Sequence, residues 1–146
     1  MKKILISACL VGDKVNYKGQ GKYHPDVEKL KEKYELVLFC PEMEGGLPTP
    51  RLPNEIRGAS VIREDGKDVT EEFMAGANKA LMLCKYLGIT IAVLKENSPS
   101  CGTHEIYNGY FMNRKVPGMG VTARLLKEKG IAVYSENEID KLIEEN

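Results

Sequence analysis

The stretch Ile89-Thr90-Ile91-Ala92-Val93-Leu94 is the most apolar run of the chain, and four of its first five residues, all except Ala92, are β-branched. Such a run predicts a strand that is buried on both faces, which is typical of a central place in a parallel sheet. Residues 70–87 precede it, with apolar side chains at helical spacing, and Gly88 is suited to end that helix. A helix followed directly by a buried strand indicates an α/β fold.

The same alternation extends in both directions from this run. We expect strands at residues 3–9, 35–40 and 131–134, helices at 25–34, 120–129 and from Ser135 onward, and a small hairpin over 59–69 that turns at Asp65-Gly66. Thr70 is expected to cap the 70–87 helix, and Ser135 with Glu138 forms a capping box. The pattern predicts an α/β domain with a mainly parallel sheet flanked by helices.

Length and charge narrow the class of protein. With 146 residues, of which 42% are hydrophobic and 29% charged, the chain is long enough for one core and too short for two full domains, so residues 1–146 are expected to form a single domain. Its 21 basic and 21 acidic residues are interleaved, which argues against direct binding of nucleic acid. No apolar run approaches the length of a membrane span or a signal peptide, so we expect a cytoplasmic protein with no membrane partner.

Three of the four cysteines follow predicted strands. Cys9 closes the strand at 3–9, Cys40 closes the strand at 35–40, and Cys101 lies a few residues after Leu94. If these strands are parallel neighbours, the three thiols meet at the carboxyl edge of the sheet, where open α/β sheets bind ligands. Three soft ligands at one edge predict a metal or cluster site with one coordination position left for a substrate.

The spacing of the cysteines disfavours some kinds of metal or redox site but does not single out one. Structural zinc sites and redox dithiols usually contain close Cys-x-x-Cys pairs, and this chain has none. Iron–sulfur clusters accept thiolates at irregular spacings. The alternative is that the three are ordinary buried core thiols, as is expected for Cys84 on the apolar face of the 70–87 helix.

A glycine motif offers a rival interpretation. The segment Gly118-Met119-Gly120-Val121-Thr122-Ala123 fits the G-x-G-x-x-A form of a dinucleotide-binding loop and opens a predicted helix. Residues 112–117 before it are not an apolar strand, so the required context is absent. The N-terminus of the helix remains a candidate for holding part of a substrate.

Four segments of the chain resemble the bacterial domain-of-unknown-function family 523, which includes thiouracil desulfurase. The segments occur in the family's order over nearly the whole chain, and they are Ser7-Ala8-Cys9-Leu10-Val11-Gly12, Cys40-Pro41-Glu42 with Gly45-Gly46-Leu47-Pro48-Thr49-Pro50-Arg51, Leu94-Lys95-Glu96-Asn97-Ser98-Pro99-Ser100-Cys101-Gly102, and Gly118-Met119-Gly120-Val121-Thr122-Ala123.

The resemblance implies a Rossmann-like, desulfurase-like domain that carries a 4Fe–4S cluster. By position, the cluster would be held by Cys9, Cys40 and Cys101, with one open iron for the sulfur of the substrate. The implied reaction is the non-redox conversion of a small thiolated heterocycle, of the 2-thiouracil type, to uracil and sulfide. The oligomeric state is not implied.

Four further residues are candidates for the reaction. Glu42 is a candidate catalytic base for the incoming water, or else it caps loop amides. Ser98 is a candidate donor to a thiocarbonyl or ring nitrogen, with an ordinary turn serine as the alternative, and Ser100 is a weaker substrate-binding candidate of the same type. Arg51 is expected either to orient an anionic or carbonyl group of the substrate or to pin its own loop to Glu55 or a backbone carbonyl.

Two other functions stay open at this point. One is a cluster- or zinc-binding sensor or accessory module without catalysis. The other is removal of sulfur from thiouridine in RNA, for which a separate RNA-binding chain would supply the contact.

Overall fold

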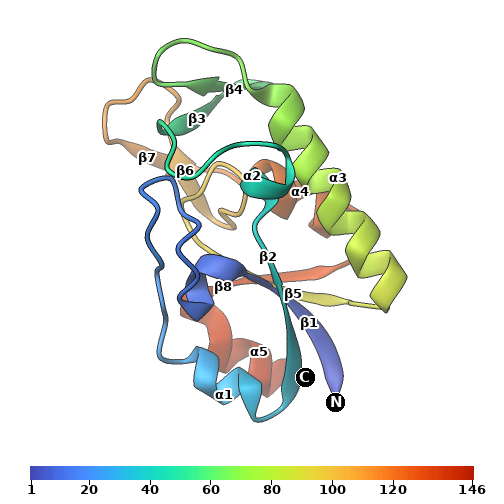
Figure 1. Cartoon of the computed structure of the whole chain (residues 1–146). Coiled ribbons are helices and arrows are strands. Elements are labelled where there is room, and N and C mark those ends of the chain that lie inside the picture. Colours follow the sequence, from blue (N-terminus) through green and yellow to red (C-terminus); the bar gives the residue numbers. More distant parts are fainter.

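A computed structural model, which describes all 146 residues, is built around a four-stranded parallel sheet (Figure 1). Its strands lie in the order β2-β1-β5-β8 and comprise β1 (Lys2–Ser7), β2 (Tyr34–Phe39), β5 (Ile91–Leu94) and β8 (Ala132–Ser135). The apolar run at 89–94 forms β5, which pairs with a strand on each side. The predicted central position and the mainly parallel sheet are therefore confirmed.

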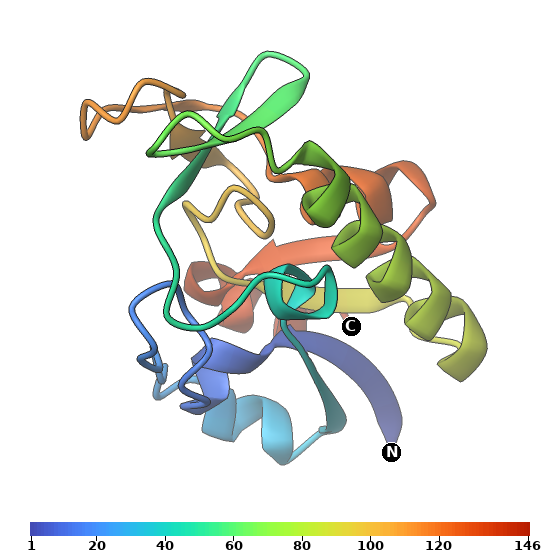
Figure 2. The same cartoon turned by 45° about the horizontal axis from the view of Figure 1, so that its top comes forward.

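Helices cover both faces of the sheet (Figures 1 and 2). On one face lie α1 (Val27–Lys31) and α5 (Ile139–Glu145), and on the other lie α3 (Thr70–Leu87) and α4 (Val121–Glu128). Successive side chains of a strand point to opposite faces. Ile4 of β1 therefore packs in the cluster of α1 and α5, whereas the neighbouring Leu5 packs with α3 and α4.

Two antiparallel hairpins lie at one end of the molecule, on the side of α3 and α4 (Figures 1 and 2). The first pairs β3 (Asn54–Arg57) with β4 (Ser60–Arg63), and the second pairs β6 (Glu105–Tyr107) with β7 (Lys115–Pro117). Strand β3 contacts β6, so the two hairpins touch each other. Together they form a wall beyond the sheet.

The first hairpin differs from its prediction. The chain does turn at Asp65-Gly66, where the amide of Arg63 donates to the carbonyl of Lys67. The main pairing, however, is β3 with β4, and it turns at Gly58, whose φ of 63° favours glycine. Strands β6 and β7 were not predicted, because three residues are too few to show an apolar alternation.

Short helices were also missed. They are the 3-10 helices η1 (Ala8–Val11) and η2 (Glu136–Glu138) and the single-turn helix α2 (Pro41–Glu44). Each of them begins one or two residues after the end of a sheet strand. Each therefore sets the direction in which the chain leaves the carboxyl edge of the sheet.

One helix cap is as predicted and one is not. The capping box of Ser135 and Glu138 is present at the start of η2, which leads into α5. Thr70, in contrast, is already helical, and its hydroxyl accepts the amide of Val61. Asp68 accepts the amide of Thr70 instead, so a contact with β4 replaces the predicted cap. None of the helices has the length and apolar composition needed to cross a membrane.

Candidate active site

The cavity at the carboxyl edge of the sheet contains three of the four cysteines. Cys9 lies in η1 after β1, Cys40 lies between β2 and α2, and Cys101 lies in the loop after β5. Because β2, β1 and β5 are adjacent and parallel, the three positions are neighbours. All three residues line one cavity of about 540 Å³, so the predicted meeting of the thiols at this edge is confirmed.

Burial and mutual proximity disfavour charge on these thiols. Burial raises the pKa of Cys9 to about 11 and that of Cys101 to about 12, and the charges of neighbouring thiolates and of Glu42 add to both shifts. The pKa of Cys40 is also raised, again mainly by burial. Thiols in such a site become good ligands when a metal centre supplies the compensating positive charge.

The donor set has the chemistry of an iron–sulfur site. Three thiols line one cavity, and iron–sulfur clusters are held by cysteine thiolates, which need not be closely spaced in the sequence. Cys84, a residue of α3, lies outside this cavity and is buried in the core, as predicted for a structural residue.

Glu96 organises the loop that carries Cys101. Its carboxylate accepts the backbone amides of Thr103 at 2.8 Å and His104 at 3.0 Å, and the hydroxyl of Thr103 at 2.7 Å. Burial alone would raise the pKa of Glu96, but these hydrogen bonds, with those from the His104 ring and the Glu105 amide, outweigh it and lower the pKa to about 2. This role could not be predicted from the sequence, because Glu96 and its partners are spread over ten residues without a motif.

Ser98 and Ser100 have different surroundings. The hydroxyl oxygen of Ser98 accepts the amides of Ser100 and Cys101 at 3.1 and 3.0 Å, and Ser98 lines the cavity. Ser98 is thus a turn serine whose proton is still available to a ligand. Ser100 is buried, bonded to the hydroxyl of Thr122 at 2.7 Å, and does not line the cavity. The structure therefore does not bring Ser100, a predicted substrate-binding residue, to the site.

The glycine motif packs against the loop that carries Ser100 and Cys101. A Cβ atom on Gly120 would lie 2.4 Å from the carbonyl group of Ser100, so only glycine permits the contact. The first amides of α4 are occupied as well, since Val121 donates to the carbonyl of Pro99 and Thr122 to that of Ser100, both at 2.9 Å. These amides are not free to bind a phosphate or a substrate, so the structure argues against a dinucleotide-binding loop here.

Glu42 lies in the first turn of α2, with its carboxylate 3.1 Å from the guanidinium of Arg51. Its side chain is 16% exposed and that of Arg51 only 3%. Burial raises the pKa of Glu42, and the charge of Arg51 partly opposes this shift. The side chain of Glu42 pairs with Arg51 and accepts no loop amide, so the predicted alternative of amide capping is wrong.

Arg51 also fixes its own loop. One terminal nitrogen donates to the carbonyl of Pro48 and the hydroxyl of Thr49, and the other donates to the carbonyl of Val15. One of the predicted roles was to pin the loop to Glu55 or to a backbone carbonyl, and the partners found are backbone carbonyls. Both terminal nitrogens are occupied, so Arg51 holds Glu42 in place, and only its buried Nε has no partner in the protein.

Close packing of α2 on α3 sets the position of Glu42. A Cβ atom on Gly76 would lie 1.9 Å from the carbonyl oxygen of Pro41, and one on Gly45 would lie 2.0 Å from that of Glu72. The two helices approach at distances that no other residue permits. The packing on α3 thus fixes the position of helix α2, and the ion pair with Arg51 fixes the carboxylate of Glu42.

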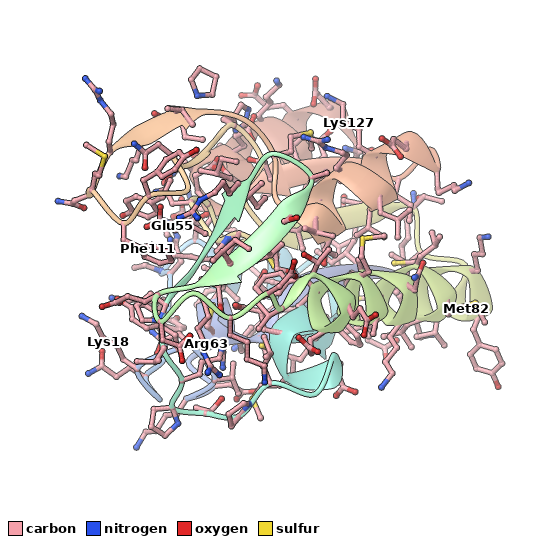
Figure 3. The ribbon with its side chains drawn as sticks, turned by 90° about the horizontal axis from the view of Figure 1, so that it is seen from above. Lys18, Glu55, Arg63, Met82, Phe111 and Lys127 are labelled. Carbon is pink, nitrogen blue, oxygen red and sulfur yellow. The ribbon has the colours of Figure 1, made fainter.

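Several cavity residues were not predicted from the sequence. Asn54 and Asn97 line the cavity, and the side-chain oxygen of each is buried without a hydrogen-bond partner. Phe111 lines it from the loop between β6 and β7, next to Glu55 (Figure 3). Asn97 lies inside a motif of the resemblance and could have been marked by it. No signal marked Phe111, which stands in a stretch without periodicity.

Comparisons with known proteins agree with this architecture. A family model described as 2-thiouracil desulfurase matches residues 4–138. The uncharacterized protein YbbK of Bacillus subtilis (strain 168) is 43% identical over 150 residues, which cover 96% of this chain and 99% of YbbK. A solved structure of the [4Fe-4S]-dependent thiouracil desulfidase TudS superposes with a TM-score of 0.93 at 47% identity, covering 98% of this chain and 96% of TudS. The likeness extends over both the sheet and the hairpins.

Proposed function

The chain belongs to the 2-thiouracil desulfurase family, and from this premise we propose that it removes sulfur from a small thiolated nucleobase of the 2-thiouracil type. In the overall reaction the C=S bond breaks and a C=O bond to the oxygen of water forms. Both protons of that water leave with the sulfur as hydrogen sulfide, so no electrons are exchanged. The observation that carries the proposal is the cavity in which Cys9, Cys40 and Cys101 lie with Glu42.

In this proposal the thiolates of Cys9, Cys40 and Cys101 would hold a 4Fe–4S cluster. The cluster dependence of TudS supports this assignment. When bound, the cluster supplies a thiophilic Lewis acid for the sulfur of the substrate. The protein supplies a cavity in which burial favours the pairing of thiolates with metal over free charge.

Glu42 is the base for the incoming water. Its carboxylate lines the same cavity as the thiols, and its charge is felt by both Cys9 and Cys101. Arg51 holds one carboxylate oxygen through its terminal nitrogen and leaves the other to accept a proton from water. Arg51 is thus a positioning residue for Glu42.

Ser98 is the hydrogen-bond donor to the heterocycle. Its oxygen already accepts two backbone amides, which polarise the O–H bond and fix the oxygen in the turn before Cys101. Only the hydroxyl proton of Ser98 is still free to form a hydrogen bond, and it can point into the cavity. Contact with a ring nitrogen or the thiocarbonyl would orient the base in front of the thiols.

The test is metal content and turnover of protein purified without oxygen. We expect about four irons and as many sulfides per chain, together with conversion of 2-thiouracil into equal amounts of uracil and sulfide. Stoichiometric zinc without sulfide would contradict the proposal. A full cluster with no turnover of thiouracil would point instead to a non-catalytic module, or to thiouridine in RNA if that substrate alone lost sulfur.

A further inference from the structure

The loop between β6 and β7 forms one wall of the cavity, and its backbone is held in an unusual conformation. Phe111, whose side chain lines the cavity, has a φ of 57°, in the left-handed region. Asparagine tolerates this region, as Asn113 does here with a φ of 55°, but a bulky aromatic residue rarely adopts it. Such a conformation persists only where the surroundings enforce it, and it is common at binding sites.

The surroundings that enforce it come from β3. The buried carboxylate of Glu55 accepts the amides of Gly109 at 2.9 Å and Phe111 at 3.2 Å, across more than fifty residues of sequence. The guanidinium of Arg57 donates twice to the carbonyl of Gly109, at 2.9 and 2.7 Å, and lies 4.4 Å from the centre of the Tyr110 ring. Figure 3 shows Glu55 and Phe111 side by side.

A second observation at the same wall points to a ligand. Asn54, next to Glu55 on β3, is 7% exposed and lines the cavity, and its side-chain oxygen has no partner in the protein. A buried acceptor without a donor is costly. A ring N–H of a heterocycle would satisfy it. The wall therefore offers an aromatic face and a hydrogen-bond acceptor, the two features by which a planar base is recognised.

We propose that Phe111 is the aromatic surface on which the ring of the thiolated base stacks, and that Glu55 is the positioning residue that holds Phe111 in place. This inference rests on the proposed function, since it takes a planar thiolated base as the substrate. Stacking uses the π-face of the ring and not the exchanged atom, so Phe111 contacts the substrate before and after sulfur removal alike. It therefore contributes to binding, whereas Glu42 contributes to the chemical step.

The chain contains no tryptophan, which allows a direct test of contact. Phe111→Trp places the only indole of the holoenzyme at the proposed stacking surface. Met112→Trp is the matched control, because Met112 is the next residue, is 64% exposed and does not line the cavity. With uracil, the unreactive product, as the probe, we expect a saturable change in the fluorescence of Phe111→Trp and none in that of Met112→Trp.

Kinetics then test the division of roles. Phe111→Ala is expected to raise both KM for 2-thiouracil and the dissociation constant of uracil by about 5- to 100-fold, with kcat within about twofold of the wild-type value. Phe111→Tyr should bind nearly as the wild-type does. Glu55→Ala should raise KM similarly and add little in combination with Phe111→Ala, since both act through one contact. Glu55→Gln, which keeps an acceptor oxygen, should recover most of the affinity.

The outcomes separate this inference from the proposed function. A wild-type enzyme that converts thiouracil and binds uracil, together with an unchanged KM in Phe111→Ala or an unresponsive indole in Phe111→Trp, would overturn the stacking role alone. Should Phe111→Ala fail to fold, the Trp and Tyr variants still decide the question. A wild-type enzyme with a full cluster that neither binds uracil nor converts thiouracil would overturn the proposed function, and this inference with it.

Discussion

The two ends of the cavity are held by different forces. The sheet and its helices are joined by apolar packing, with buried clusters of eleven and ten residues on the two faces. At the hairpin end, a cluster of only three buried residues joins β4 to the start of α3, and polar contacts such as those of Glu55 and Arg57 hold the loop between β6 and β7. The cysteines lie on the packed end and Phe111 on the polar end. In the function proposed above, the packed end would place the cluster ligands and the hairpin end would bind the ring of the substrate.

The largest expected effect comes from removing a cysteine thiol at the packed end. Cys9→Ser, Cys40→Ser and Cys101→Ser should each abolish cluster binding, because serine is a poor ligand for iron in place of a thiolate. Iron and sulfide content with the visible absorption spectrum measures the loss. Cys84→Ser is the matched control, as Cys84 lies outside the cavity, and it should retain the cluster. Retention of a full cluster by any of the first three variants would remove that cysteine from the ligand set.

The next effect is on the chemical step alone. Glu42→Gln should keep the cluster and the substrate affinity but lower kcat by about 100-fold or more, since the amide cannot accept a proton from water. The measurement is steady-state turnover on protein with verified iron content. Glu44→Gln is the control, because Glu44 lies in the same helix α2 but does not line the cavity. Full activity in Glu42→Gln would exclude it as the base.

A smaller effect tests how the packed end holds Glu42. Gly76→Ala should destabilise the protein by about 1–3 kcal/mol, because its Cβ would lie 1.9 Å from the carbonyl oxygen of Pro41 and push α2 off α3. Thermal unfolding measures the loss, and turnover should fall with it. Asn78→Ala, on the exposed face of the same helix, should leave the melting temperature unchanged or slightly raised. Equal stability of both variants would show that α2 does not rest on Gly76.

The smallest expected effect depends on pH and concerns the loop between the two ends. The folded state lowers the pKa of Glu96 to about 2 from its ordinary value of 4.5. Its hydrogen bonds therefore stabilise the protein fully above pH 4.5, and this stabilisation is lost as the pH falls from 4.5 toward 2. Melting temperatures measured across that window should fall less steeply for Glu96→Gln than for the wild-type. Parallel curves would contradict the assigned role of Glu96.

The contrast between the apolar packed end and the polar hairpin end also explains which features could be predicted from the sequence. The strands of the sheet and the positions of Cys9, Cys40 and Cys101 were predictable, because continuous apolar runs and their ends are local signals. The role of Thr70 was not predictable, because its hydroxyl accepts a hydrogen bond from the amide of Val61, in another strand. The role of Phe111 was not predictable either, because its conformation depends on the carboxylate of Glu55, which lies far away in the sequence.

The orientation of Ser100 shows the same limit in the candidate site. From the sequence Ser100 was a weaker candidate of the same type as Ser98, and in the structure it packs against α4 and does not line the cavity. Pinning its loop was one of two roles expected of Arg51, but its ion pair with Glu42 joins two segments that no local pattern links. Side-chain direction and long-range partners are decided by tertiary contacts.

The placement of the three cysteines after three separate strands also bears on how the protein matures. No short segment of the chain contains two of them, so a newly made chain has no local peptide that could capture iron, unlike proteins whose ligands lie in one close-spaced motif. The thiols become neighbours only when β2, β1 and β5 have paired. We therefore expect the sheet to form before the three thiols can bind a metal centre together.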